Sequence, residues 1–217
     1  MWHVIVPVKA WGAAKSRLSL PLRHRQTLAR AMAQDTVERL AQCSLVCEVS
    51  VVTTSPFMVG SAELRAATRV LVQPDGVVGL DEALSWAIGE TSEKASRRAT
   101  GTAVVVADLP ALTSPALEQL LNVASGNSVS MVVDRHGTGT TVLAATEPQL
   151  LTPRFGAYSA TRHRRSDLNR DMTVLGRDVC GPGVRCDVDT LDDLAAARSL
   201  GLGPHSRLVD AQLGSPS

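Results

Sequence analysis

Three aspartates have the types and spacing needed for metal-assisted chemistry. Asp187 and Asp189 flank Val188, and Asp108 directly follows the apolar run 103–107 (AVVVA). In an extended chain, residues i and i+2 project to the same side, about 6.5 Å apart. Two carboxylates placed in this way raise each other's pKa, and a nearby cation removes that cost. Mg²⁺ is the natural cation, because it prefers carboxylate oxygen and keeps water ligands that it shares with phosphates.

Each aspartate also has a purely structural interpretation. Asp108 alone fits a turn or a helix start as well as it fits a ligand position. Asp189 could cap the helix that follows it, and Asp187 could pair with Arg185. These roles explain one residue at a time and explain the Asp187–Asp189 pair less well. We therefore predict that Asp108, Asp187 and Asp189 bind one or two Mg²⁺ ions, which suits phosphoryl or nucleotidyl transfer.

A basic loop follows the first predicted strand and contains Lys15 and Arg17. Lysine and arginine near a strand end neutralise a triphosphate and the charge that develops on it during reaction. The small residues 12–14 let the backbone approach a ligand closely. For Lys9 alone, a solvated surface position is the preferred interpretation. The loop has neither G-x-x-x-x-G-K-[ST] nor G-x-G-x-x-G, which disfavours a P-loop NTPase and a dinucleotide-binding dehydrogenase.

A second anion site is predicted at residues 137–140 (GTGT), where exposed backbone N–H groups and two hydroxyls would form a nest. Downstream, residues 162–165 (RHRR) place four basic side chains together, which favours an anionic small molecule. Nucleic acid is disfavoured, because aromatic residues are not interleaved and the net charge is only +1. His163 is a candidate acid–base group. A positioning role or a plain surface position is preferred for it, because phosphate attack needs no strong base.

These residues depend on strands that alternate with helices. We predict strands at 3–8, 48–53, 68–72, 103–107, 128–134, 141–145 and 184–188, and helices at 23–42, 80–90, 114–123 and 190–200. Ser114 before Pro115, and Thr190, are the predicted N-caps. The polar stretch 154–177 is assigned to no element. The alternation indicates an α/β fold with a mostly parallel sheet, which binds ligands at the carboxyl ends of its strands.

The length of the chain suits one domain, predicted at 1–205, followed by a frayed tail at 206–217. The four cysteines, with C-x3-C and C-x5-C spacings, match no zinc or redox motif. No signal peptide is recognised, so we expect a reduced protein of the cytoplasm. No apolar run approaches the roughly 18 residues that a membrane span needs, and no membrane partner is expected.

Taken together, the motifs resemble the guanylyltransferases of coenzyme F420 biosynthesis. The likeness rests on GTGT at 137–140, RFG at 154–156, S-x-x-RHRRS at 159–166 and RCDVDT at 185–190. The opening PVK…AAKSRL, the central ADLPAL and the late DLAAARSLGLGP extend it over almost the whole chain. The family comprises 2-phospho-L-lactate guanylyltransferases and their actinobacterial relatives that use phosphoenolpyruvate.

This resemblance implies a nucleotide-diphospho-sugar-transferase-like (Rossmann-like) fold. It implies that the three aspartates bind Mg²⁺, and that Thr140, Gly156 and Ser159 contact phosphoenolpyruvate. Lys15 and Arg17 match the loop expected near the GTP phosphates, which gives both a catalytic role together with Asp108. The chain departs from the usual family pattern at two positions. Ala107 stands where glycine usually precedes the first aspartate, and Asp81 stands where asparagine is frequent.

The reaction implied by the resemblance joins GTP to phosphoenolpyruvate. A phosphate oxygen of phosphoenolpyruvate attacks the α-phosphorus of GTP, giving enolpyruvoyl-diphospho-5'-guanosine and diphosphate. A downstream transferase of the F420 pathway would take the product. The same chemistry on 2-phospho-L-lactate or 3-phosphoglycerate stays open, and so does a non-catalytic nucleotide-binding subunit. Intact Asp108, Asp187, Asp189, Lys15 and Arg17 speak against the last alternative.

Overall fold

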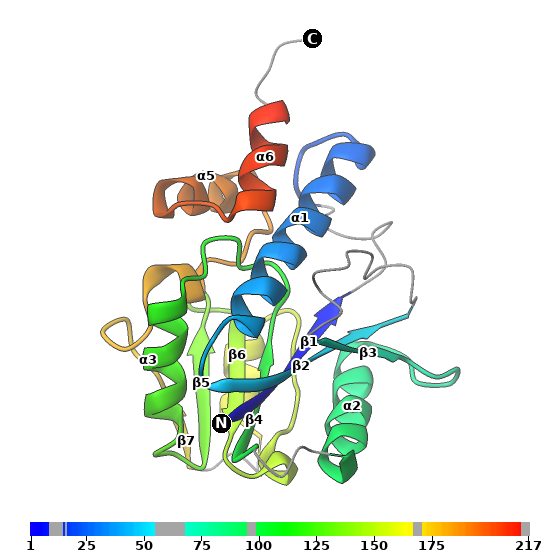
Figure 1. Ribbon diagram of the computed structural model, residues 1–217, viewed down its shortest axis with the longest axis vertical. Coiled ribbons are helices and arrows are strands. Elements are labelled where there is room, and N and C mark those ends of the chain that lie inside the picture. The colour runs from blue at the N-terminus through cyan, green and yellow to red at the C-terminus, as the bar shows by residue number, and fades with distance from the viewer. Residues whose placement is uncertain (9–14, 16, 55–67, 95–98, 167–170, 214–217) are drawn as a thin grey trace.

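A computed structural model of the 217-residue chain describes residues 1–8, 15, 17–54, 68–94, 99–166 and 171–213 (Figure 1). The expectations for Lys9 and for residues 12–14 lie outside these described residues. Within the described part of the chain, no helix is both long enough and apolar enough to cross a membrane.

A seven-stranded sheet forms the centre of the molecule, in the order β3-β2-β1-β4-β6-β5-β7. Its strands are β1 (Trp2–Val8), β2 (Val46–Thr53), β3 (Thr68–Val72), β4 (Gly101–Val105), β5 (Val129–Val133), β6 (Thr140–Ala145) and β7 (Met172–Val174). β6 runs antiparallel to both of its neighbours, and the other pairs of adjacent strands are parallel. The predicted α/β fold with a mostly parallel sheet is therefore confirmed.

Helices cover both faces of this sheet (Figure 1). They are α1 (Leu22–Ala41), α2 (Leu80–Lys94), α3 (Ser114–Ala124), α4 (Ser159–Arg164), α5 (Leu191–Leu200) and α6 (Pro204–Leu213), with short 3₁₀ turns at Pro148–Leu150 and Pro182–Arg185. Val4 and Val6 of β1 pack with α1 and α3, whereas Ile5 packs with α2 on the other face. This alternation explains why the strand reads as a continuous apolar run, because both of its faces are buried.

The strand directions bring several loops to one edge of the sheet. β1 and β4 are parallel neighbours, so the chain leaves Val8 and Val105 at the same edge. β5 has the same direction as β4, because both are antiparallel to β6. For the same reason, β6 begins at this edge, with Thr140. The fold therefore gathers the loops after β1, β4 and β5 around the start of β6.

Two local predictions are wrong. Residues 184–188 form no strand, since they begin within the 3₁₀ turn Pro182–Arg185 and continue as irregular chain. Proline removes a backbone donor there, and Gly183 packs so closely on the backbone of Ala111 that a Cβ has no room. Ser114 is not the N-cap of α3. That position belongs to Thr113, whose backbone is extended, and Ser114 and Pro115 lie in the first turn.

The predicted frayed tail is also wrong for residues 206–213, which belong to α6. The carboxylate of Asp35 on α1 accepts the N–H groups of His205 (3.0 Å) and Ser206 (2.8 Å), and so caps α6. Arg198 of α5 forms a two-bonded ion pair with Asp210 of α6. Asp35 lies 170 residues before His205 in the sequence, so no local pattern predicts this cap. Residues 214–217 lie outside the described chain.

Candidate active site

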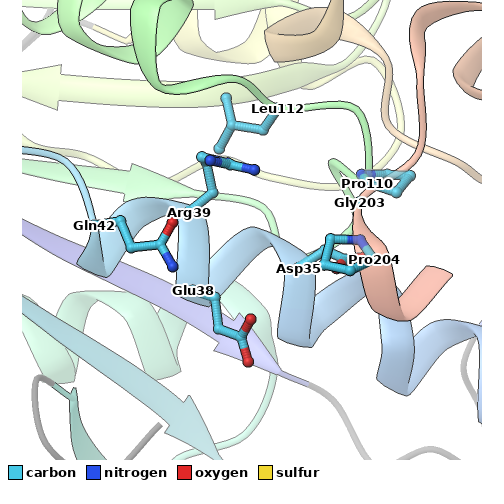
Figure 2. A pocket seen from close by; sticks show the side chains of 8 residues that line it. All are labelled: Asp35, Glu38, Arg39, Gln42, Pro110, Leu112, Gly203 and Pro204. Atoms are coloured by element: carbon cyan, nitrogen blue, oxygen red, sulfur yellow. The ribbon is translucent and has the colours of Figure 1, made fainter. Parts of the chain in front are cut away.

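Two cavities lined by described residues differ greatly in size, and the larger has room for a nucleotide. Figure 2 shows the smaller, about 50 Å³, where Asp35 of α1 lies against Gly203 and Pro204 at the start of α6. The larger cavity, about 380 Å³, opens at the sheet edge where the loops after β1, β4 and β5 meet. Ligand pockets in proteins usually span about 300–1,000 Å³. Its lining includes all the predicted site residues: Lys15, Arg17, Asp108, Thr140, Gly156, Ser159, Asp187 and Asp189.

The loop after β4 carries Asp108 and is held from two sides. The N–H of Leu109 donates to the hydroxyl of Thr36 on α1, at 3.1 Å. The carbonyl oxygen of Asp108 accepts the N–H of Val188, also at 3.1 Å. This second bond brings the segment with Asp187 and Asp189 alongside Asp108, although the segment is not a strand of the sheet. This bond between two loops places all three aspartates around one cavity.

The structural alternatives for Asp187 and Asp189 do not describe the observed contacts. Thr190 is the N-cap of α5, and it forms a capping box with Asp193. The Asp193 carboxylate also accepts the N–H of Asp189, at 3.2 Å. The guanidinium of Arg185 donates to the carbonyl oxygens of residues 133 and 134, at 3.0 and 2.9 Å. Thr190 thus caps α5 in place of Asp189, and Arg185 binds carbonyl oxygens in place of Asp187, which leaves both carboxylates to line the cavity.

Lys15 lies between two of the aspartates. Its ammonium group contacts Asp108 Oδ2 and Asp189 Oδ1, the latter at 2.9 Å. Burial opposes the charge of this lysine, but the two carboxylates outweigh burial and raise the pKa of Lys15 above its usual value. Burial likewise opposes the charge of Asp189, and Lys15 outweighs it and lowers the pKa of that carboxyl. Arg17, which is exposed, approaches Asp189 at 3.7 Å.

For Asp187, the charge of Lys15 compensates burial and like charges only in part. Burial, followed by the charges of Asp108 and Asp134, raises the pKa of Asp187 to about 8. Among the described residues, Asp108 Oδ1 and Asp187 Oδ1 are buried carboxylate oxygens without a hydrogen-bond partner. Buried polar atoms are nearly always paired, so two unpaired carboxylate oxygens in one crowded site fit the binding of a cation.

The protein ligands for that cation are few. In the part of the chain that the structure describes, no three carboxylate, thiol or imidazole side chains converge into a complete metal site. Lys15 occupies the space between Asp108 and Asp189. Mg²⁺ suits this arrangement, because it binds through one or two carboxylates and completes its shell with water and substrate phosphate.

His163 is buried, so a plain surface position is wrong for it, and its two ring nitrogens bind other parts of the protein. Its Nε2 accepts the N–H of Arg154 at 2.8 Å, which places the ring hydrogen on Nδ1. Nδ1 then donates to the hydroxyl of Thr140, at 2.9 Å. Burial, followed by the charge of Arg162, lowers the pKa of His163 to about 4. The ring is therefore neutral near pH 7 and connects the start of β6 to the segment that precedes Gly156.

The predicted anion nest at 137–140 is already filled by a side chain of the protein. The carboxylate of Asp134 accepts the N–H groups of Thr138 (2.9 Å) and Gly139 (2.7 Å). A Cβ at position 139 would collide with this carboxylate. Sequence reasoning missed Asp134, although it directly follows β5 as an acid at a strand end. Asp134 lines the cavity and shapes the turn that leads to Thr140.

The fold and this cavity define an α/β nucleotidyltransferase: a mostly parallel sheet with one cavity at its edge, lined by acids, a lysine and a set of small polar residues. Residues 2–208 match the model of the family described as guanylyl transferase CofC like, and the chain belongs to this family. A phosphoenolpyruvate guanylyltransferase of Thermomonospora curvata is 38% identical over 215 residues, which cover 98% of this chain and 90% of that protein.

Solved structures support the same fold. A putative nucleotide-diphospho-sugar transferase from Desulfovibrio desulfuricans G20 superposes with a TM-score of 0.66 at 15% identity, covering 97% of this chain and 94% of that one. A Mycobacterium tuberculosis H37Rv protein, whose crystal structure is a complex with manganese, has a TM-score of 0.52 at 20% identity. This superposition covers 90% of this chain and 96% of the mycobacterial one. The predicted nucleotide-diphospho-sugar-transferase-like fold is confirmed.

Proposed function

We propose that this guanylyl transferase joins GTP to phosphoenolpyruvate and releases diphosphate. The observation that carries the proposal is one cavity lined by two chemically different sets of residues. Lys15, Arg17 and the three aspartates form the set suited to a triphosphate and a cation. Thr140, Gly156 and Ser159 line the same cavity and suit a small acid with a phosphate group. The name of the Thermomonospora relative supports phosphoenolpyruvate as that acid.

Alignment of the two substrates and electrostatic stabilisation of the transition state account for most of the proposed catalysis. A phosphate oxygen of phosphoenolpyruvate attacks the α-phosphorus of GTP, and the bond to the β-phosphate oxygen breaks as diphosphate leaves. Lys15, which is held charged by Asp108 and Asp189, and Arg17 face the negative charge that spreads over the transferring group. Holding both reactants in one cavity removes much of the entropic barrier of a two-substrate reaction.

A divalent cation would complete the proposed site, held by one or two carboxylates from the set Asp108, Asp187 and Asp189, with its other ligands from water and substrate phosphate. The unpaired oxygens of Asp108 and Asp187 and the crowding of negative charge support this assignment. The cation would polarise phosphate oxygens and neutralise charge on the leaving diphosphate. We propose Mg²⁺. The manganese in the mycobacterial structure belongs to that protein, and it is the reason for testing Mn²⁺ as well.

The product of this reaction would be enolpyruvoyl-diphospho-5'-guanosine. A mixed diphosphate of this type is an activated donor, so a second transferase must consume it. We place that step in coenzyme F420 biosynthesis and in the cytoplasm. Two other acceptors, 2-phospho-L-lactate and 3-phosphoglycerate, share the phosphate and carboxylate and differ only around C2 and C3.

Release of diphosphate tests the proposal. The protein is incubated with GTP, Mg²⁺ or Mn²⁺, and each of the three acids in turn, with ATP and CTP as alternative nucleotides. We expect diphosphate and the guanosine product with GTP and phosphoenolpyruvate, at a kcat/KM above that of the other pairs. Absence of diphosphate with every three-carbon acid would overturn the proposal. Binding of GTP without turnover would favour the non-catalytic nucleotide-binding subunit.

A further inference from the structure

One ion pair holds both backbone polar groups of Phe155, the residue before Gly156. Asp81, in the first turn of α2, accepts the N–H of Phe155 at Oδ1 (2.7 Å) and a bond from Arg162 at Oδ2 (3.1 Å). Arg162, on α4, donates through its other terminal nitrogen to the carbonyl oxygen of Phe155, at 2.8 Å. Carboxylate, guanidinium and peptide groups therefore form a closed ring of hydrogen bonds.

This ring acts next to the cavity rather than inside it. Phe155 and Leu80, the neighbour of Asp81, line the cavity. The side chains of Asp81 and Arg162 are 25% and 45% exposed. An ion pair this exposed contributes little to stability by itself. Its bonds to the peptide groups are charge-assisted and directional, so they define the position of the chain more than they add to the free energy of unfolding.

The segment held by the ring has a backbone that needs support. Gly156 has a φ of +98°, and Tyr158 has a φ of +55°, which is the left-handed region that a side chain rarely adopts. The N–H of Ser159 donates to the carbonyl oxygen of Gly156, at 3.2 Å. The position of Ser159 thus depends on that of Gly156, and the position of Gly156 depends on the peptide groups of Phe155.

We propose that Asp81 and Arg162 are positioning residues for the phosphate acid that accepts the guanylyl group. They hold Phe155 so that Gly156 and Ser159 keep the spacing that the acceptor requires. The inference rests on the proposed function for the identity of the acceptor. According to this inference, Arg162 binds other groups of the protein, in place of the direct anion binding expected from the basic run at 162–165.

The decisive variants remove one corner of the ring at a time. Arg162→Met removes both donors, and Arg162→Lys keeps the charge but loses the planar fork that reaches two acceptors. We expect each to raise KM for phosphoenolpyruvate by about tenfold, the equivalent of one charge-assisted hydrogen bond, with KM for GTP changed less than about twofold. Asp81→Asn still accepts the Phe155 N–H and should have a smaller effect. Asp81→Asn combined with Arg162→Met should be no worse than Arg162→Met alone, because both side chains hold the same residue, Phe155, through one network.

Arg198→Met is the matched control. It breaks another two-bonded arginine–aspartate pair, with Asp210, between α5 and α6 and away from the cavity lining. We expect KM for both substrates to stay at the wild-type value. A purely structural role for Arg162 would appear as a lower unfolding midpoint, with both KM values unchanged or changed equally. Full rescue by Arg162→Lys would show that charge alone suffices. Either result would overturn the inference.

Hydrogen exchange separates this inference from the proposed function. The Phe155 amide, bonded to Asp81, should exchange about tenfold faster or more in Asp81→Ala than in the wild type, even without substrate. If the wild type shows no turnover with any acceptor, the proposed function fails and the exchange rate still decides whether the ring holds Phe155. Unchanged exchange in Asp81→Ala would overturn the positioning role.

Discussion

Asp189 shows how one carboxylate serves several contacts at the residue scale. It holds the ammonium of Lys15 at 2.9 Å, lies near Arg17, and keeps its backbone fixed by Asp193. Asn at this position keeps the shape and loses the charge. The lysine would then face Asp108 alone. We therefore propose an electrostatic role for Asp189, and its loss should affect turnover far more than folding.

We predict that Asp189→Asn lowers kcat/KM by at least about a hundredfold, comparable to the loss of one preorganised electrostatic contact in other enzymes. The unfolding midpoint in urea should stay close to that of the wild type. Asp192→Asn is the control, because Asp192 is an exposed acid in the first turn of α5. Turnover of Asp189→Asn within a few-fold of the wild type would remove Asp189 from the site.

The unpaired oxygen of Asp187 leads to a prediction that needs no turnover. Mg²⁺ at millimolar concentration should raise the melting temperature of the wild type by ~2–4 °C, because binding to the folded state alone stabilises it. Asp187→Asn should lose that increase. K⁺ at matched ionic strength is the control for general screening. An equal increase in both proteins would place the cation elsewhere.

His163 makes stability depend on pH. The unfolded chain takes up a proton near the usual pKa of 6.5, whereas the folded protein does so only near a pKa of about 4. Between these values the unfolded state binds more protons, so the free energy of unfolding falls as pH falls through this window. The contribution of His163 is full above pH 6.5 and lost below pH 4. Its upper value is about 3 kcal/mol.

Comparison with His163→Gln isolates this effect from the other titrating groups. The difference in unfolding free energy between wild type and variant should shrink as pH falls from 7 to 4.5. Urea unfolding at several pH values measures it. A difference that stays constant over this range would mean that the ring at 163 is not held neutral in the fold.

At the scale of elements, α6 depends on a cap from another helix. The carboxylate of Asp35 accepts two N–H groups from its first turn, and Gly203 leaves the space that this carboxylate fills. The N–H of Gly203 also donates to the carbonyl oxygen of Pro110, two residues after Asp108, at 2.7 Å. The last helix is thereby connected to the loop that carries the first aspartate.

We expect Asp35→Ala to lower the free energy of unfolding by about 1–2 kcal/mol, the usual cost of losing an N-cap. Limited proteolysis should cut within α6 earlier than in the wild type. Asp171→Ala, at an exposed turn position, serves as the control and should change neither measurement. Equal protease resistance in Asp35→Ala and the wild type would show that α6 does not need this cap.

Local elements were predictable where the pattern is local. The apolar strands, the long helices and the Thr190 cap follow from residue type and spacing within a few positions. The conformation of segment 184–188 was not predictable in this way. Its alternating pattern is typical of a strand, whereas Pro182 and Gly183 begin a 3₁₀ turn. Asp187 and Asp189 still reach the cavity, through the bond between Val188 and Asp108 instead of through strand geometry.

Contacts between distant parts of the chain account for what sequence reasoning missed. The cap from Asp35 spans 170 residues, and the bond between Asp81 and Arg162 spans 81. A single sequence contains no signal that pairs such positions. Asp134 is different, because it follows a strand just as Asp108 does. The same rule of an acid at a strand end would have found it.

For the whole molecule, one antiparallel strand decides which residues share the cavity. β6 starts at the edge where β1 and β4 end, so Thr140 faces the same cavity as Lys15 and Asp108. A fully parallel sheet would begin that strand at the opposite edge. The topology therefore supports the central claim, which is that two substrates meet at one edge of one sheet.

Isotope transfer tests this claim most directly. The protein is incubated with GTP, Mg²⁺ and phosphoenolpyruvate that carries ¹⁸O in its phosphate group, and the products are weighed by mass spectrometry. Attack by the phosphate oxygen on the α-phosphorus of GTP predicts equal amounts of diphosphate without label and of a guanosine diphosphate ester that retains all of it. Label in the diphosphate, or formation of diphosphate without the ester, would contradict the account.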